Sequence, residues 1–354
     1  MRIGVDDRDN PETIRLKKYA TGAHLILESE PVETGRTPKE LVWTKNKAKL
    51  YRYEPEEKRH PVPVLLVYAL ILRPYVLDLV PNNSLIEHLV GEGFDVYLLD
   101  WGVPGDEDKD LSFEHYVLDY LPRMVRKVLR ASGSDELTLF GYCQGGTICA
   151  MYAALFPDGP LRNLVLLAAP VGFATEEARG LFKPLTSERF FDPDPVIEAF
   201  GNVPATDLFG AGRRLPGAAS DRPEVEPAHL AREAFTDSFL AASEWVDDGV
   251  PFPGEAFRSW VLDFYRHDRL ARGELELRGR RVELSNVRVP LLDVAGKEDV
   301  ICPLPQAEAA MGLVGSRDKE LFTLDAGHVG LMAGPVAKGK FWPRLVDWLA
   351  QRSA

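Results

Sequence analysis

The sequence predicts an α/β fold with a mostly parallel sheet and one helical insertion. Short, continuous apolar runs alternate along the chain with segments of helical periodicity, a pattern typical of strands buried on both faces between helices. The alternation stops over residues 174–285, where apolar positions recur at helical spacing, and it resumes at residue 289. A chain of 354 residues therefore fits one core domain that carries a large insertion.

The composition limits the classes of partner and the compartment. Hydrophobic residues make up 45% and charged residues 27%, as in globular domains. A net charge of −12 argues against nucleic acid as a partner, although a local basic pocket for an anionic substrate stays open. The three cysteines show no disulfide or CxxC spacing, so we expect a reducing compartment and no metal. The N-terminus lacks a signal-peptide core, and the longest apolar run, residues 62–72, is too short for a transmembrane segment, so a cytoplasmic location is expected.

The first part of the chain divides into a leader and the opening of the core. Residues 1–55 are assigned to an N-terminal leader, in which 41–53 alternate enough for one or two strands. The core then covers 56–173 and opens with the apolar run PVLLVYAL. Its further predicted elements are a helix over 83–92 with Asn83 as possible N-cap, a strand over 94–100, an amphipathic helix over 113–129, a strand over 136–142, a helix over 145–156 and a strand over 161–170.

The insertion and the end of the core follow. Residues 174–285 are rich in Pro, Phe, Arg and acidic residues and are predicted to form a mostly helical cap. The core resumes over 286–354, with strands over 289–296 and 319–327 and a closing helix over 341–351.

The strongest motif is Gly141-Tyr142-Cys143-Gln144-Gly145-Gly146, between a predicted strand and a predicted helix. It matches the nucleophile elbow, G-x-nucleophile-x-G, with cysteine as the nucleophile. Glycines are needed there because side chains would collide in so sharp a turn. The helix N-terminus favours a thiolate. The motif predicts an α/β-hydrolase fold with Cys143 as nucleophile; a buried structural cysteine is the alternative.

Two further residues complete a triad in the chain order of that fold, which is nucleophile, acid, base. Asp299 follows the strand after the insertion, and His328 follows the last strand. Taken singly, Asp299 could be a solvated loop acid, with Glu298 as a rival, and His328 could be structural. Their joint order predicts the triad Cys143, His328 and Asp299.

The oxyanion hole requires backbone N–H groups aimed at the developing charge. One is expected from Gln144, which follows the nucleophile, and the second from Leu70, after the first core strand; a plain strand end is the alternative for Leu70. Asp100-Trp101-Gly102 is interpreted as a strand-end turn. Cys149 and Cys302 are interpreted as packing residues.

These motifs resemble the polyhydroxyalkanoate synthases, most closely the short catalytic subunit of the two-subunit, class III type. The similarity lies in VYALILRPYVLDLVPNNSLIEHLVGEGFDVYLLDWGVP, LFGYCQGGT, EAFRSWVLDFYRHDRLARGELELRGRRVEL and GHVGLMAGPVAKGKFWPRLVDWL, within residues 39–350. The resemblance implies polymerisation of (R)-3-hydroxyacyl-coenzyme A on a cysteine thioester, with Cys143, Asp299 and His328 as the family's triad. It implies no cofactor, because the coenzyme A thioester is the substrate. It also implies a growing polyester chain, a homodimer, a companion synthase subunit and a location at the polyester granule surface.

Two other functions stay open from the sequence. A thioesterase or esterase with the same triad would release the acyl group to water, and a non-catalytic granule-associated protein would keep the fold alone. The chain also departs from the family's usual residues at 71–73, which are Ile-Leu-Arg, and at 326–327, which are Ala-Gly. The insertion carries aromatics that need an apolar partner, either the core or another subunit, namely Phe190, Phe191, Trp245 and Phe252.

Overall fold

A mostly parallel, eight-stranded sheet forms the centre of the molecule. The structure is a computed structural model that describes residues 32–189, 191–205 and 233–353. The strand order is β1-β2-β6-β3-β7-β8-β11-β12. Pairing is antiparallel from β1 to β6 and parallel from β6 to β12. The strands are β1 (Glu40–Lys45), β2 (Ala48–Tyr53), β3 (Val64–Val67), β6 (Val96–Asp100), β7 (Leu137–Tyr142), β8 (Leu161–Leu167), β11 (Leu291–Gly296) and β12 (Lys319–Leu324). The predicted α/β class is confirmed.

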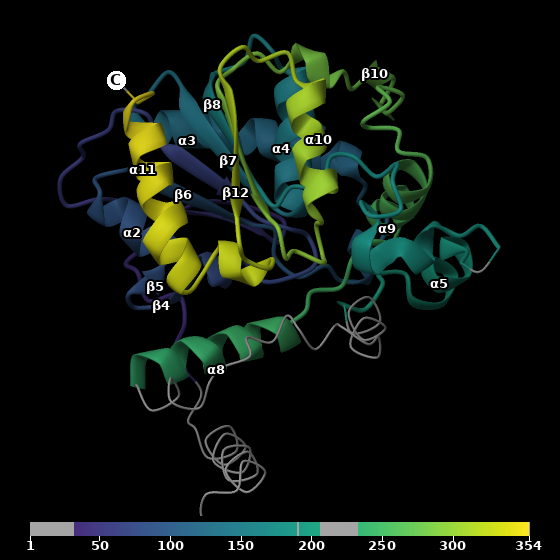
Figure 1. Cartoon of the computed structure of the whole chain (residues 1–354), viewed down its shortest axis with the longest axis horizontal. Helices are drawn as coiled ribbons and strands as arrows, with labels where there is room; N and C mark the ends of the chain where they lie inside the picture. Colours follow the sequence, from purple (N-terminus) through teal and green to yellow (C-terminus); the bar gives the residue numbers. More distant parts are fainter. Residues whose placement is uncertain (1–31, 190, 206–232, 354) are drawn as a thin grey trace, which may run out of the picture.

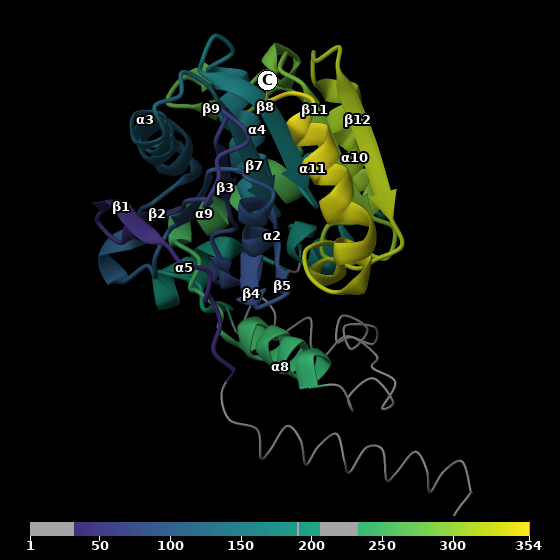
Figure 2. The same ribbon diagram turned by 90° about the vertical axis from the view of Figure 1, so that its left-hand side faces the viewer.

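Helices cover both faces of this sheet. Figure 2 shows the sheet nearly face on, with β1 at one edge, β12 at the other, and α2 and α11 in front. Helices α4 and α10 pack on the opposite face, against β7 and β11. The helices are α2 (Leu85–Gly91), α3 (Leu121–Ser132), α4 (Gln144–Leu155), α10 (Leu304–Leu313) and α11 (Trp342–Ala350). Every residue of α4 is buried, which explains its small and apolar composition.

Two local predictions need correction. The N-cap of α2 is Ser84, not Asn83, because the Ser84 hydroxyl accepts the N–H of Glu87 at 2.9 Å. The Asn83 side chain instead accepts the N–H of Gly334 at 2.8 Å. The predicted helix over 113–129 consists of a π-helical turn, η4 (His115–Tyr120), followed by α3. Elements that the pattern did not indicate are α10, the short pair β4 (Asp78–Val80) and β5 (Asn83–Ser84), and the hairpin β9 (Glu276–Leu277) and β10 (Arg280–Arg281).

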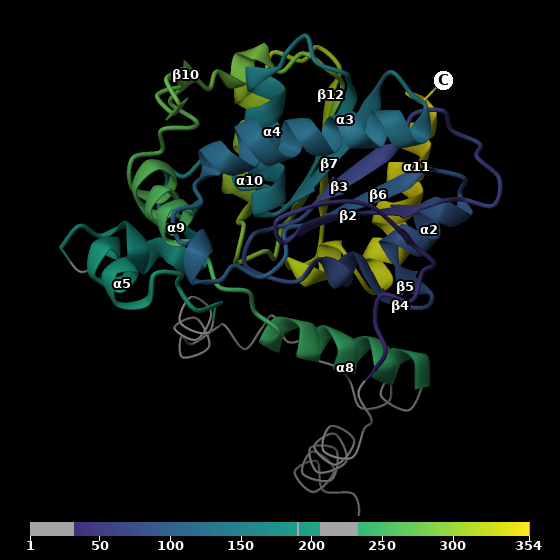
Figure 3. The same cartoon turned by 180° about the vertical axis from the view of Figure 1, so that it is seen from behind.

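The described part of the insertion is mostly helical. Its hairpin β9-β10 lies beside the end of α4, where Arg280 donates to the carbonyl of Leu155 at 2.6 Å, but its helices lie toward the carboxyl ends of the parallel strands (Figure 1). Figures 1 and 3 show α8 across these ends, with α5 and α9 to one side. The elements are η5 (Gly180–Thr186), α5 (Pro193–Phe200), α8 (Glu233–Asp247), α9 (Gly254–Ser259) and η7 (Trp260–Arg266). Strands β1 and β2, inside the segment assigned to the leader, form an antiparallel edge of the core sheet. Among the described helices, none has a stretch long and apolar enough to cross a membrane.

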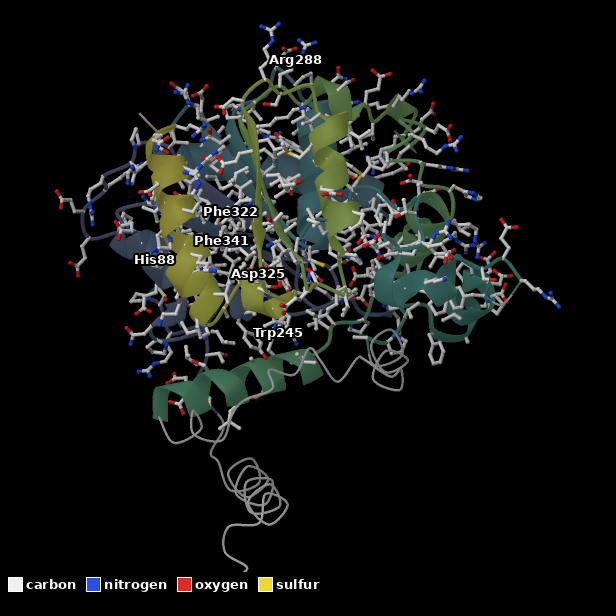
Figure 4. The ribbon with its side chains drawn as sticks, in the orientation of Figure 1. His88, Trp245, Arg288, Phe322, Asp325 and Phe341 are labelled. Carbon is white, nitrogen blue, oxygen red and sulfur yellow. The ribbon has the colours of Figure 1, made fainter. Side chains whose placement is uncertain are left out.

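The insertion's aromatic side chains are largely packed within the chain. Trp245 rises from α8 toward the core, where its indole N–H donates to the carbonyl of Arg73 at 2.7 Å (Figure 4). Phe252 is also buried, and Phe191 is half-buried. Phe190 lies outside the described residues. For Trp245 and Phe252, packing inside the chain therefore supplies the apolar partner that the sequence required.

Candidate active site

The turn between β7 and α4 places Cys143 in a strained backbone conformation. Its φ is 55° and its ψ −132°, a region that costs a residue with a side chain about 1–3 kcal/mol. The turn is fixed on both sides, because the N–H of Cys143 donates to the carbonyl of Leu167 at 2.9 Å and its carbonyl accepts the N–H of Gly146 at 2.8 Å. Helix α4 begins at the next residue, so the sulfur lies at the positive end of the helix dipole.

The elbow needs glycines because neighbouring backbone atoms leave no space for a Cβ. A Cβ on Gly141 would lie 2.4 Å from the Cα of Gly146. A Cβ on Gly145 would lie 2.2 Å from the carbonyl oxygen of Val67, at the end of β3. The backbone at the end of β3 therefore contacts the first turn of α4 directly. An oxyanion hole needs this contact, because its two N–H donors come from these two segments.

Asp299 and His328 meet in loops after β11 and β12. One carboxylate oxygen, Oδ2, lies 2.7 Å from His328 Nδ1. The other, Oδ1, accepts the N–H groups of Ile301 at 2.9 Å and Cys302 at 2.8 Å. This carboxylate is therefore held from one side by two backbone donors and presents its free oxygen to the imidazole. Glu298, the rival acid, is exposed.

The imidazole of His328 is hydrogen-bonded to Asp299 through Nδ1 and interacts with the neighbouring Cys143 side chain. Burial opposes protonation of the ring, but the Asp299 carboxylate and then Cys143 outweigh it, so the pKa of His328 lies well above its ordinary value. The ring is further fixed by Tyr142, which stacks on it at 5.0 Å between ring centres and donates its hydroxyl to the His328 carbonyl at 2.9 Å. The arrangement favours a proton resting on the imidazole, beside the sulfur.

The predicted oxyanion donors lie together but are not equally available. Gln144 is the first residue of α4, so its N–H has no acceptor inside the helix. The N–H of Leu70 instead donates to the Gln144 side-chain oxygen, Oε1, at 3.2 Å. Both residues are buried. A substrate oxygen would have to replace this side-chain oxygen to use both donors.

The Asp100-Trp101-Gly102 turn supports the segment after β3. The Trp101 indole N–H donates to the carbonyl of Tyr68 at 3.0 Å, and Asp100 accepts the N–H of Gly102 at 2.9 Å. Gly102 has a φ of +78°, and a Cβ there would lie 2.4 Å from the carbonyl oxygen of Lys47. The turn thus holds in place the loop that contains Leu70.

The neighbouring thiols are unsuited to nucleophilic attack. Cys149 and Cys302 are buried and free. Burial raises the pKa of both thiols well above the ordinary value, and for Cys302 the charges of Asp299 and Cys143 add to it. Within residues 32–189, 191–205 and 233–353, no cluster of His, Cys, Asp or Glu has the arrangement of a metal site.

The roles of Tyr142 and Tyr68 at the site could not be predicted from the sequence. Tyr142 stood inside the recognised motif, but nothing in the pattern indicated that its ring would stack on His328. Tyr68 packs against Tyr142 at 5.4 Å between ring centres and against Trp245 at 6.5 Å. These aromatic contacts connect the insertion to the base, and they join residues far apart in the chain, so spacing alone could not reveal them.

Comparison with known proteins gives two family matches. The family described as "alpha/beta hydrolase fold" matches residues 62–335, and "Poly-beta-hydroxybutyrate polymerase (PhaC) N-terminus" matches residues 31–89. The "Poly(3-hydroxyalkanoate) polymerase subunit PhaC" of Haloferax mediterranei is 37% identical over 326 residues, which are 91% of this chain and 65% of that protein. The protein of the same name from Allochromatium vinosum is 33% identical over 341 residues, 95% of each chain.

Among solved structures, the monoacylglycerol lipase of Paleococcus ferrophilus is similar in fold. It superimposes with a TM-score of 0.54 and 21% identity, over 86% of this chain and 99% of that one. At this identity the likeness concerns the fold alone.

Proposed function

Because the chain belongs to the family of poly(3-hydroxyalkanoate) polymerases, we propose that it polymerises 3-hydroxyacyl-coenzyme A through a covalent thioester on Cys143. The family expected from the motifs is confirmed by its relatives. The observation that supports the covalent mechanism is the series of Asp299, which is hydrogen-bonded to His328, and Cys143, which interacts with His328 at a nucleophile elbow. Such a series activates a nucleophile whatever the fold that holds it.

In the acylation step, the Cys143 sulfur attacks the thioester carbonyl carbon of the substrate. The carbon–sulfur bond to coenzyme A then breaks, and the proton held on His328 passes to the departing thiol. A thiolate suits this exchange because the entering and leaving groups are both thiols of similar leaving ability. The N–H groups of Gln144 and Leu70 would hold the carbonyl oxygen while it is negative.

In the elongation step, the acyl group on Cys143 is transferred to a hydroxyl. His328 takes the proton of the 3-hydroxyl at the end of the chain or of the next monomer, and that oxygen attacks the acyl carbon. An ester forms and the Cys143 thiol is released. Asp299 orients the imidazole for both steps and stabilises it when protonated.

The burial of the triad supports transfer to a hydroxyl in preference to water. Only 9% of Cys143 and 4% each of Asp299 and His328 are exposed. Polymerisation requires that water be excluded from the acylated sulfur. Helix α8 of the insertion lies across this end of the sheet, and its Trp245 packs against Tyr68 (Figure 1). We assign the insertion, residues 174–285, the role of a cap over a core made of residues 56–173 and 286–354.

The assembly and location are proposed by analogy with the family. The Allochromatium vinosum relative is named as a subunit, which supports a companion subunit for this chain, and we propose a homodimer of the catalytic chain. No cofactor is needed for the chemistry above. A cytoplasmic enzyme that works at the surface of its own polyester granule fits an insoluble product.

The test is to incubate the purified chain with 3-hydroxybutyryl-coenzyme A and to follow thiol release and polymer in the same sample. Thiol release with a matching mass of polyester supports the proposal. Thiol release with free 3-hydroxybutyrate and no polymer would make the chain a thioesterase, and no thiol release would make it non-catalytic. Sedimentation with and without substrate tests the dimer separately.

A further inference from the structure

The side chain of Gln144 lies where a substrate oxygen has to bind. Its Oε1 accepts the N–H of Leu70 at 3.2 Å, and that N–H is the second donor of the proposed oxyanion hole. The first donor, the backbone N–H of Gln144, belongs to the same residue. One residue therefore supplies half of the hole through its backbone and fills the other half with its side chain.

The surroundings hold this contact in place. The end of β3 packs closely on the first turn of α4, because a Cβ added at Gly145 would lie 2.2 Å from the Val67 carbonyl oxygen. The segment after β3 is tied from its other side by the Trp101 indole, which donates to the carbonyl of Tyr68. Leu70 is 3% exposed and Gln144 is 1% exposed, so bulk water does not reach the bond. The donor and its side-chain acceptor are thus fixed relative to each other.

We propose that the Gln144 carboxamide is an internal stand-in for the substrate oxygen, which keeps the oxyanion hole filled at rest and is displaced only when the oxygen becomes negative. An empty hole would leave the buried N–H of Leu70 without an acceptor. A neutral thioester carbonyl is no better an acceptor than the carboxamide. A full oxyanion is, because hydrogen bonds to a charged acceptor are about twice as strong.

The consequence is selective binding of the transition state. The carboxamide competes with the ground-state carbonyl and yields to the tetrahedral intermediate, so the second hydrogen bond forms only as the reaction proceeds. The inference rests on the proposed function in that Cys143 is taken as the nucleophile. It does not depend on whether the acyl group then goes to a hydroxyl or to water.

The test uses two changes at Gln144 with opposite expected effects. Gln144→Met keeps the length of the side chain and removes the acceptor. An oxyanion can then accept the N–H of Leu70 without a competing side-chain oxygen. Gln144→Glu keeps the acceptor and makes it negative, so it holds Leu70 and repels the oxyanion. If the bond between Gln144 and Leu70 only positions the loop, the affinities for an oxyanion should follow the reverse order, because glutamate keeps that bond and methionine removes it.

The probe is trifluoromethyl propyl ketone. The Cys143 sulfur bonds to the ketone carbon, the carbonyl electron pair moves to the oxygen, and His328 keeps the proton, so the adduct carries an oxyanion. Its dissociation constant is read from protection of Cys143 against iodoacetamide. We expect affinity to rise about tenfold in Gln144→Met, the equivalent of one ordinary hydrogen bond, and to fall by roughly a hundredfold in Gln144→Glu.

The matched control is Gln306→Met, the same change at a buried glutamine of α10 that is not bonded to Leu70. Its affinity for the ketone should equal that of the wild type. Equal affinity in all Gln144 forms, no adduct in any of them, the reverse order, or a rise shared by Gln306→Met would each overturn the proposal. If Gln144→Met fails to fold, the fall in Gln144→Glu decides alone. Because the adduct forms without coenzyme A or polymer, failure of the polymerase assignment shows separately, in the thiol and polymer assay.

Discussion

Replacing Asp299 by asparagine changes the proton on His328 rather than the shape of the site. In the wild type, Oδ1 accepts the N–H groups of Ile301 and Cys302, and Oδ2 faces His328 Nδ1 at 2.7 Å. An asparagine must keep its oxygen toward the two backbone donors, so its NH₂ group turns to the imidazole. Nδ1 must then be an acceptor, which places the ring proton on Nε2, the nitrogen that should take a proton.

The two steps of the reaction should suffer unequally. Elongation needs the imidazole as a base for a hydroxyl, so we expect it to fall by about 10³- to 10⁴-fold, the usual effect of the wrong tautomer in a triad. Acylation needs a thiolate, and even an unassisted thiol is roughly a few per cent ionised at neutral pH. Its loss should therefore stay near 10- to 100-fold.

The assay separates the steps in one preparation. A single turnover with stoichiometric 3-hydroxybutyryl-coenzyme A measures acylation as thiol release, and excess substrate measures elongation as steady polymer formation. The matched control is Asp293→Asn, the same change at a buried aspartate of β11 that lies outside the triad and whose pKa is raised by burial. Glu298→Gln tests the exposed rival acid. Equal losses in both steps would contradict a special need for Asp299 in elongation, and a loss in Glu298→Gln as large as that in Asp299→Asn would contradict Asp299 as the acid of the triad.

Three further outcomes are expected. His328→Gln removes a group whose pKa the fold raises above 6.5, and such a group stabilises the folded state fully below that pH and progressively less as the pH rises through its folded value. The difference in free energy of unfolding from the wild type, measured in urea, should therefore shrink with rising pH, and growth with pH would contradict the raised pKa. Gly145→Ala should destabilise the fold by about 2–3 kcal/mol because its Cβ would lie 2.2 Å from the Val67 carbonyl oxygen. Gly312→Ala, in an open position of α10, should stabilise the fold by about 0.5–1 kcal/mol. If both variants changed the free energy of unfolding in the same direction, the close contact between Gly145 and Val67 would have no energetic effect. Trp245→Ala should speed reaction of Cys143 with iodoacetamide several-fold by removing a ring packed on Tyr68, and an unchanged rate would count against the role of α8 as a cover.

The strands and the elbow were predictable because local sequence determines them. Continuous apolar runs mark strands buried on both faces, and glycines mark the turn where a Cβ would strike the backbone. The N-cap of α2 was placed one residue early because Asn83 and Ser84 are both good caps, and only the contact of Asn83 with Gly334 decides between them.

The missed features depend on contacts between distant segments. Helix α10, which packs on β11, consists largely of short, apolar residues, so apolar and polar positions hardly alternate at helical spacing. The helix signal in the sequence is therefore weak there. The aromatic series from Trp245 to Tyr142 joins the insertion to the core across about a hundred residues. The oxygen of Gln144 could not be placed on Leu70 from the motif, because side-chain direction at the elbow follows from the fold of the loop after β3.

Cys143 as the covalent nucleophile can be tested by the mass of the peptide that contains it, after brief exposure to 3-hydroxybutyryl-coenzyme A and an acid quench. We expect that this peptide gains one or more 3-hydroxybutyryl units, that hydroxylamine removes them, and that Cys143→Ala gains none while it remains folded. Acyl groups on another residue, or thiol release at the wild-type rate by Cys143→Ala, would contradict this role of Cys143.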